Sequence, residues 1–228
     1  MTSITATLLD CMGSDMTTVN AARVSYNRES EALGASGVEG SPMLPVLNDG
    51  DKRLIGYLAS NKHTSPFGHA FASFLCEAPI YVCRQMVKHK FLRINEVSRR
   101  YISDDPTFYY PPHYRSAIRN KKQGSGRRVE DAEGNAAIAN VTKHNARSMM
   151  EYRNLLSAGI CEEQARSVLP LSMMTKWWWS GSLDAFADMC RLRCAPDAQE
   201  ESRILAMQIS VEMVKRYPVS WAALRGIH

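Results

Sequence analysis

The chain has no apolar run long enough to cross a membrane, since Glu77 interrupts even its richest hydrophobic stretch. Its first residues also lack the basic segment and following apolar segment that form a secretory signal peptide. These absences argue against the secreted and membrane classes. We therefore expect a cytoplasmic protein that works away from membranes.

The cysteines follow no spacing typical of a disulfide framework or a zinc site. Cys190 and Cys194 are four residues apart, but no second Cys or His pair completes a metal centre. No cysteine adjoins a His or a helix start, so we expect buried reduced thiols and no catalytic cysteine. No carboxylate or Cys completes a site around His63 and His69, so we predict no metal.

Positive charge is concentrated in one part of the chain. The net charge over 228 residues is +5. Residues 84–128 alone hold 12 Lys and Arg against 3 Asp and Glu, which leaves 16 against 20 elsewhere. Such a basic zone concentrates anionic ligands, among them nucleotides, dinucleotide cofactors, polyglutamates and nucleic acids.

The strongest chemical signal is the segment 88–101, KHKFLRINEVSRRY. It surrounds a His, an Asn, a Glu and a Ser with two lysines and three arginines, and it leaves almost no apolar face. Guanidinium groups bind phosphates through paired hydrogen bonds, and the added polar residues favour one pose. Apolar residues at helical spacing precede it. We expect a buried helix that starts at residues 78–80 and delivers Gln85, Lys88 and His89 to its C-terminal end.

Hydrophobic periodicity predicts one mixed α/β (α+β) domain over residues 1–228. Strands are expected over residues 3–9, 69–77 and 172–180, and helices over 17–24, 51–58, 141–158, 161–167, 182–193 and 197–216. Asp51 is expected to cap its helix. Within the third strand, alternation predicts that Trp177 and Trp179 are core and that Trp178 faces another layer or a subunit. Residues 104–113 are predicted to have no regular secondary structure. The polar, Gly-containing stretches 27–50 and 120–136 are expected to be mobile loops.

Several motifs occur in a characteristic order: ARVS, HTSPFGH, RQMVKHKFLRINEVSRRY, VLPL and LRC. The central one holds a basic–His–basic triplet, Lys88-His89-Lys90, followed after seven residues by Ser98. From about residue 8 to residue 215, this order resembles the flavin-dependent thymidylate synthases. The resemblance implies that family's fold, a small antiparallel sheet packed by helices, and its homotetramer with active sites shared between subunits.

The resemblance also implies the family's reaction. A methylene group comes from methylenetetrahydrofolate and a hydride from reduced FAD, so that dUMP becomes dTMP, and NADPH reduces the flavin. FAD carries out the redox chemistry, so the protein has to bind, orient and polarise the reacting molecules. No enzymic nucleophile is needed, which agrees with the absence of an activated cysteine.

By resemblance, the dUMP site consists of Gln85, Glu96, Ser98, Arg99, Arg100, Arg166 and Arg193. Most of these would hold the phosphate, Arg99 through its backbone, at roughly 1.5–3 kcal/mol for each charge-assisted hydrogen bond. Glu96 would accept a hydrogen bond from the sugar. Arg193 would lie at the uracil, where a guanidinium favours negative charge on the ring and makes C5 more nucleophilic. Arg193 is therefore the predicted catalytic residue.

By resemblance, FAD contacts Ser25, Ser65, Lys88, His89, Lys90, Phe91, Glu96, Ser182, Asp188 and Leu192. Lys88 and Lys90 stand where the family usually has Arg, which keeps the charge but loses the bidentate geometry. Further departures from the family pattern are Gly68, Ser182, Asp184, Asp188 and Asp197. Several of these departures lie on the flavin side, whereas the predicted nucleotide ligands are intact.

Two alternatives stay open. The first is a uridylate C5-hydroxymethylase or a UMP C5-methylase on the same fold. The second is a protein that binds single-stranded nucleic acid through the basic zone and its tyrosines. Asn95 and Glu96 inside the basic run argue against it, because grooves that follow phosphates rarely contain a carboxylate. The lysine form of the triplet and the long 27–50 insertion suggest a divergent, virus-encoded branch.

Overall fold

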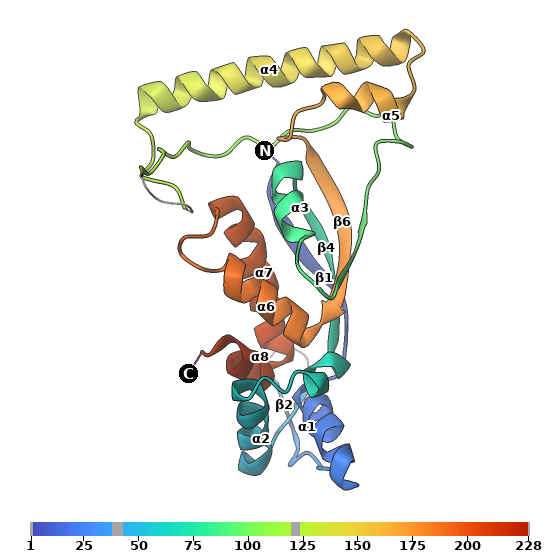
Figure 1. The fold of residues 1–228 in the computed structure, drawn as a ribbon, viewed down its shortest axis with the longest axis vertical. Coiled ribbons are helices and arrows are strands. Elements are labelled where there is room, and N and C mark those ends of the chain that lie inside the picture. Colours follow the sequence, from blue (N-terminus) through green and yellow to red (C-terminus); the bar gives the residue numbers. More distant parts are fainter. Residues whose placement is uncertain (1, 38–42, 120–123, 228) are drawn as a thin grey trace.

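The centre of the molecule is a four-stranded antiparallel sheet in the order β1-β4-β6-β5 (Figure 1). It is seen in a computed structural model that describes residues 2–37, 43–119 and 124–227. The strands are β1 (Thr5–Met12), β4 (Phe71–Pro79), β6 (Met174–Ser182) and β5 (Leu92–Glu96). The expected mixed α/β class, with a small antiparallel sheet packed by helices, is confirmed.

Alternation along the strands gives the sheet one buried and one open face. On β4, Ala72, Phe74 and Cys76 are buried, while the residues between them are only half-buried. On β6, Trp177 and Trp179 are 1% exposed, and Trp178 between them is 51% exposed. The predicted alternation of the three tryptophans is confirmed. Trp178 lies on the other face of the sheet. In the described parts of the chain, no helix packs over that face (Figure 1).

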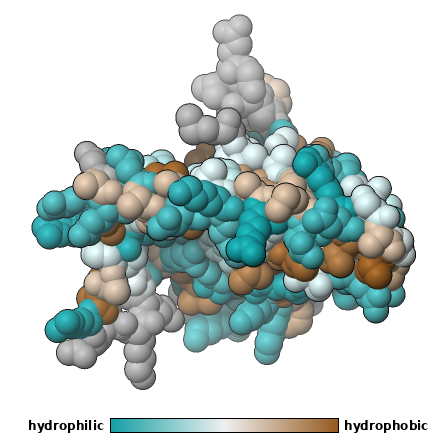
Figure 2. All heavy atoms as spheres, turned by 90° about the horizontal axis from the view of Figure 1, so that it is seen from above, coloured by the Kyte–Doolittle hydropathy of each residue, from teal (hydrophilic) through white to brown (hydrophobic). Residues whose placement is uncertain are grey.

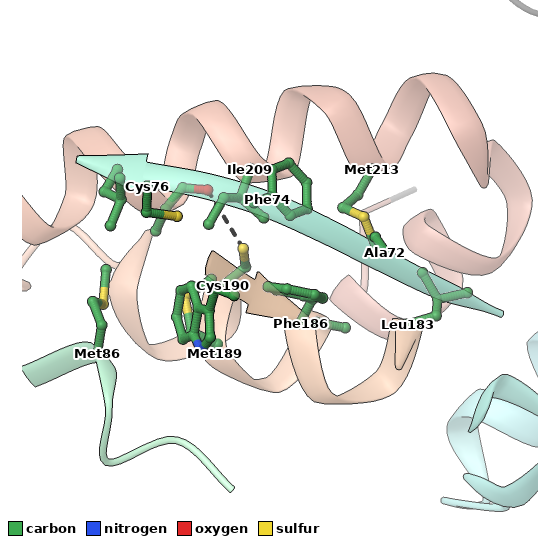
Figure 3. Packing of buried hydrophobic residues seen from close by; sticks show 14 of the residues in the cluster. Ala72, Phe74, Cys76, Met86, Leu183, Phe186, Met189, Cys190, Ile209 and Met213 are labelled. Carbon is green, nitrogen blue, oxygen red and sulfur yellow. Dashed lines mark hydrogen bonds between the residues drawn. The ribbon is translucent and has the colours of Figure 1, made fainter. Parts of the chain in front are cut away.

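Three helices cover the buried face of the sheet: α3 (Ile80–Met86), α6 (Leu183–Arg193) and α7 (Glu200–Arg216). Figure 3 shows Phe74 of β4 and Phe186 of α6 within this core, together with Ile209 of α7. The Phe186 ring meets the Phe74 ring edge to face at 5.3 Å and the Trp179 ring at 5.5 Å. Such aromatic pairs add about 0.5–1.5 kcal/mol to the free energy gained by burial.

A second helical group lies at one end of the sheet and consists of α1 (Asp15–Arg23), α2 (Asp49–Ser60) and α8 (Pro218–Arg225). The prediction that Asp51 caps α2 is wrong. The cap is Asn48, whose side chain accepts from the backbone N–H of Asp51. Asp51 is instead a buried anion, which pairs with Arg23 at 2.5 Å and accepts from Ser30 at 2.9 Å.

The long helix α4 (Asp131–Ser157) crosses the opposite end of the molecule, above α5 (Glu162–Ala165) (Figure 1). Most of its described side chains are exposed or half-buried, and its buried residues are Gly134, Asn145, Ser148 and Tyr152. Seen from this end, the surface is largely hydrophilic, and hydrophobic residues gather towards one edge (Figure 2). No helix in the described parts of the chain is long and apolar enough to cross a membrane.

Several predicted boundaries need correction. No strand was predicted over residues 92–96, which form β5, and helix α8 was not predicted either. The loop expected over 120–136 ends earlier, because α4 begins at Asp131. Residues 27–50 contain the short paired strands β2 (Ala35–Ser36) and β3 (Leu44–Pro45) and the start of α2. Residues 38–42 and 120–123 lie outside the described residues. Cys161 is exposed, contrary to the expectation of buried thiols.

Candidate active site

The segment between α3 and β5 turns sharply, and this turn gives the residues of the predicted triplet different exposures. The backbone N–H of His89 closes the end of α3 on the carbonyl O of Met86 at 3.1 Å. Phe91, with φ +63°, then reverses the chain in the left-handed region, where a non-glycine residue is strained. As a result His89 is half-buried, whereas Lys88, Lys90 and Phe91 are exposed. The two ammonium groups make no ion pair with any described residue.

The guanidinium of Arg193, at the end of α6, meets His89. Its Nε donates to Nε2 of His89 at 2.9 Å, and its Nη2 donates to the carbonyl O of Gln85 at 3.4 Å. Burial, and then the positive charge of Arg193, lower the pKa of His89 to about 4, although Asp188 acts in the opposite direction. His89 is therefore neutral near pH 7. Because its Nε2 accepts from Arg193, its proton lies on Nδ1.

A pocket of about 590 Å³ opens beside this contact. We call it the Arg193 pocket; it is lined by Gln85, Lys88, Arg115, Arg193 and Gln199, among others. Its lining contains three cationic side chains and one carboxylate, that of Asp197. Arg115 is ion-paired with Glu200 and Glu201, so Lys88 and Arg193 carry the positive charge that remains for a ligand. Against the single carboxylate of Asp197, this charge favours an anionic ligand.

A larger pocket, of about 800 Å³, lies at the end of β5 and the 3₁₀ turn η3 (Arg166–Val168). We call it the Ser98 pocket; of the predicted dUMP ligands, it is lined by Glu96, Ser98, Arg99, Arg100 and Arg166.

The side chains of the Ser98 pocket are held in different ways. Thr175 of β6 donates its hydroxyl to Glu96 Oε1 at 2.8 Å, and Arg100 Nε donates to Ser98 Oγ at 3.2 Å. The guanidinium of Arg99 bends back to the carbonyl O of Asp104.

The predicted dUMP set is therefore divided within one chain. Glu96, Ser98, Arg99, Arg100 and Arg166 line the Ser98 pocket, whereas Gln85 and Arg193 line the Arg193 pocket. The two pockets share no lining residue. Arg84 and Gln85 mark the division, because these chain neighbours line different pockets.

The predicted flavin set is spread more widely. Ser25 and Ser65 line a third pocket of about 630 Å³, whereas Lys88 and Leu192 line the Arg193 pocket and Glu96 the Ser98 pocket. At the start of α6, Ser182 donates to Asp184 Oδ1 at 2.5 Å. Asp188 pairs with Arg191 at 2.8 Å. These flavin roles stay predictions.

Sequence reasoning missed four residues that support the site: Arg115, Thr175, Gln199 and Glu201. Thr175 looked like an ordinary strand residue, yet it holds Glu96. Arg115 belongs to the basic zone, which was the only signal for it. Glu201 is a buried carboxylate in a helix, and nothing in the sequence pattern distinguishes it from a solvated one.

Comparison with known proteins agrees with the motifs. Residues 7–219 match the family described as thymidylate synthase complementing protein. The chain belongs to this family, the flavin-dependent thymidylate synthases. It is 36% identical over 216 residues to the flavin-dependent thymidylate synthase of Thermus thermophilus, covering 95% of this chain and 73% of the relative. The corresponding enzyme of Kosmotoga olearia is 32% identical and is covered over 87% of its length.

A solved structure supports the same family fold. The UMP/dUMP methylase PolB of Streptomyces cacaoi, bound with 5-Br dUMP, aligns with a TM-score of 0.83 and 28% identity. The alignment covers 99% of this chain and 96% of PolB. The flavin-dependent thymidylate synthases are enzymes that use FAD, and the chain is an enzyme of this family.

Proposed function

We propose that the chain converts dUMP to dTMP, with methylenetetrahydrofolate as carbon donor and reduced FAD, renewed by NADPH, as hydride donor. The observation that carries this proposal is the Ser98 pocket. It combines arginines and a hydroxyl suited to a phosphate with a fixed carboxylate suited to a sugar hydroxyl. A nucleoside monophosphate presents this pair of groups.

The phosphate of dUMP would bind Ser98, Arg100 and Arg166, with Gln85 as a further donor. Within the described residues, Arg100 and Arg166 form no ion pair. Their side chains donate to Ser98 Oγ and to the carbonyl O of Glu163, and the Arg100 guanidinium also lies over the Tyr101 ring at 4.9 Å. They are thus available to an anion. Each charge-assisted hydrogen bond contributes about 1.5–3 kcal/mol.

Arg193 would act on the uracil ring. Neutral His89 accepts from its Nε, and the Gln85 carbonyl accepts from its Nη2, so the guanidinium plane is held from two sides. A fixed cation near the ring carbonyls stabilises the negative charge that develops there when C5 acts as a nucleophile. His89 would position Arg193 rather than exchange a proton with the substrate.

The residues of the triplet fit a flavin dinucleotide, because exposed cations are what a pyrophosphate requires. Lys88 and Lys90 lie in a turn on either side of His89, without an ion pair to any described residue. Ser25 and Ser65 would add hydroxyl groups from the third pocket. When bound, FAD would supply the hydride, while Lys88, Lys90 and the serines bind and orient it.

A homotetramer with shared sites would bring the two halves of the dUMP set together. Two surfaces support this proposal. One is the open sheet face around Trp178. The other is a stripe on α7 at a 3-4-3 spacing, formed by Ile204, Met207, Val211 and Val214, which are 37–54% exposed. An exposed apolar stripe such as the one on α7 is typical of a surface that meets another chain. In such an assembly, the Ser98 pocket of one subunit would face the Arg193 pocket of another.

The experiment is the mass of the nucleotide product after incubation with FAD, NADPH, methylenetetrahydrofolate and dUMP, with UMP in a parallel reaction. A dUMP product heavier by one methylene unit supports the proposal. A hydroxymethylated product, or turnover of UMP alone, contradicts it and favours the alternative activity.

A further inference from the structure

An unbroken series of hydrogen bonds connects Arg115 to Gln85. Arg115 Nη2 donates to both carboxylate oxygens of Glu201 at 2.9 Å, and Gln199 Nε2 donates to Glu201 Oε2 at 3.0 Å. Gln85 Nε2 donates in turn to Gln199 Oε1. Ser202 Oγ then donates to Gln85 Oε1 at 3.1 Å. The series ends at a residue that lines the Arg193 pocket.

The direction of every bond in this series follows from its first pair. A guanidinium can only donate and a carboxylate can only accept. Burial acts to raise the pKa of Glu201, but the bonds from Arg115 and Gln199 outweigh it and leave that pKa below its ordinary value. Gln199 must therefore turn its amide N–H groups to Glu201 and its carbonyl to Gln85.

The orientation of the Gln85 side-chain amide is fixed as a result. It faces a carbonyl oxygen on one side, so it must present its amide nitrogen there, and its own carbonyl accepts from Ser202. Glu201 and Ser202 are 4% and 0% exposed, so water cannot easily replace a lost partner. An amide flip of Gln85 would set its carbonyl against the carbonyl of Gln199, and both amides are half-buried.

We propose that Glu201 is a positioning residue, which acts through Gln199 to keep the second N–H of Gln85, rather than its carbonyl, available to a phosphoryl oxygen. The cationic lining of the Arg193 pocket fits the same kind of ligand. The inference rests on the proposed function, in which Gln85 binds the phosphate of dUMP. It adds the reason why an uncharged amide at this place recognises an anion.

The test compares two variants, each of which removes one of the two negatively charged partners of Arg115. In Glu201→Gln, the new amide can turn either way, so Gln199 and Gln85 lose their fixed orientation. In Glu200→Gln, Arg115 loses its other carboxylate partner, but Glu201 still bonds Gln199. We expect Glu201→Gln to weaken dUMP binding about tenfold, with kcat within about twofold of wild type. Glu200→Gln should stay within about twofold of the wild-type Kd.

Titration calorimetry with dUMP, and with deoxyuridine as the ligand that lacks a phosphate, gives the readout. The Glu201→Gln effect should vanish for deoxyuridine. Gln199→Met, which leaves the Arg115–Glu201 pair intact, should reproduce the loss and covers the case in which Glu201→Gln does not fold. Equal losses in Glu201→Gln and Glu200→Gln, or an equal loss for deoxyuridine, overturn this inference alone. A wild-type enzyme that binds no dUMP overturns the proposed function and this inference together.

Discussion

Arg193 Nε donates a hydrogen bond to His89 Nε2 at 2.9 Å, and this contact joins the end of α6 to the turn that follows α3. The two residues lie 104 positions apart in the chain. One belongs to the predicted dUMP set and the other to the predicted flavin set. Their contact is one place where the two sets meet within a single subunit.

The contact predicts an unusual titration of His89. Its pKa of about 4 reflects burial first and the charge of Arg193 second. In Arg193→Ala the pKa of His89 should rise towards its ordinary value, without reaching it, because burial remains. Side-chain NMR signals followed over pH measure both values. A wild-type His89 that titrates near pH 6.5 contradicts the account.

The same shift gives a pH dependence of stability. The folded-state pKa of His89 lies below its unfolded-state value, so the unfolded chain takes up a proton first as the pH falls. The contribution of His89 to stability is therefore complete above about pH 6.5 and is lost towards pH 4. Denaturant unfolding of wild type and His89→Gln should show a difference that shrinks over this interval.

Thr175 should control the affinity of the Ser98 pocket through Glu96. Thr175→Val keeps the side-chain volume but removes the hydroxyl that donates to Glu96 Oε1. The freed carboxylate would rotate, and dUMP affinity should fall about tenfold, the effect of one hydrogen bond to a charged group. Calorimetry with dUMP measures it. Thr142→Val removes a hydroxyl bound to the carbonyl O of Ile138 on α4 and serves as control.

The long strands could be predicted because each alternates between core and solvent. β4 and β6 begin two residues after their predicted starts, at Phe71 and Met174. β5 could not be predicted in this way, since it is an edge strand in which Arg93, Asn95 and Glu96 are exposed and polar. Its position is fixed by pairing with β6, a contact between distant parts of the chain.

The candidate site, too, could be predicted only in part from the sequence. Motif order identifies the residues that belong to the family's site, but it does not say which of them lie together. Arg84 and Gln85 are adjacent in sequence yet line different pockets. Glu201 could not be found at all, because its role depends on Arg115 and Gln199, which only the folded chain brings near it.

Asp51 should be a main source of stability at the helical end of the molecule. It is fully buried and accepts hydrogen bonds from Arg23, Ser30 and Asn48. Asp51→Ala removes the anion and leaves these donors without it, so the free energy of unfolding should fall by about 3 kcal/mol. Urea unfolding measures the change. Asp49→Ala is the control, because it removes an exposed acid of the same helix that pairs with Lys52. This variant should lower the free energy of unfolding by less than about 1 kcal/mol.

Gly181 should be required where β5 meets β6. A methyl group there would overlap Leu92 Cδ2 and lie 3.0 Å from the carbonyl O of Phe91, so β5 would have to move. Gly181→Ala should therefore speed hydrogen exchange of the β5 amides and weaken dUMP binding. In Gly56→Ala, on α2, the added methyl meets no atom within 4 Å. The free energy of unfolding of that variant should rise by about 0.5–1 kcal/mol, and its dUMP binding should be unchanged.

The division of the predicted dUMP set between two pockets is the central claim, and mixed oligomers test it most directly. Arg166→Ala and Arg193→Ala chains, each with its own affinity tag, are co-expressed, and oligomers that carry both tags are assayed at subsaturating dUMP. If sites are shared between subunits, random assortment restores both arginines in about a quarter of the sites, and turnover recovers accordingly. If mixed oligomers are as inactive as the separate variants, each site is built from one chain, and the account is wrong.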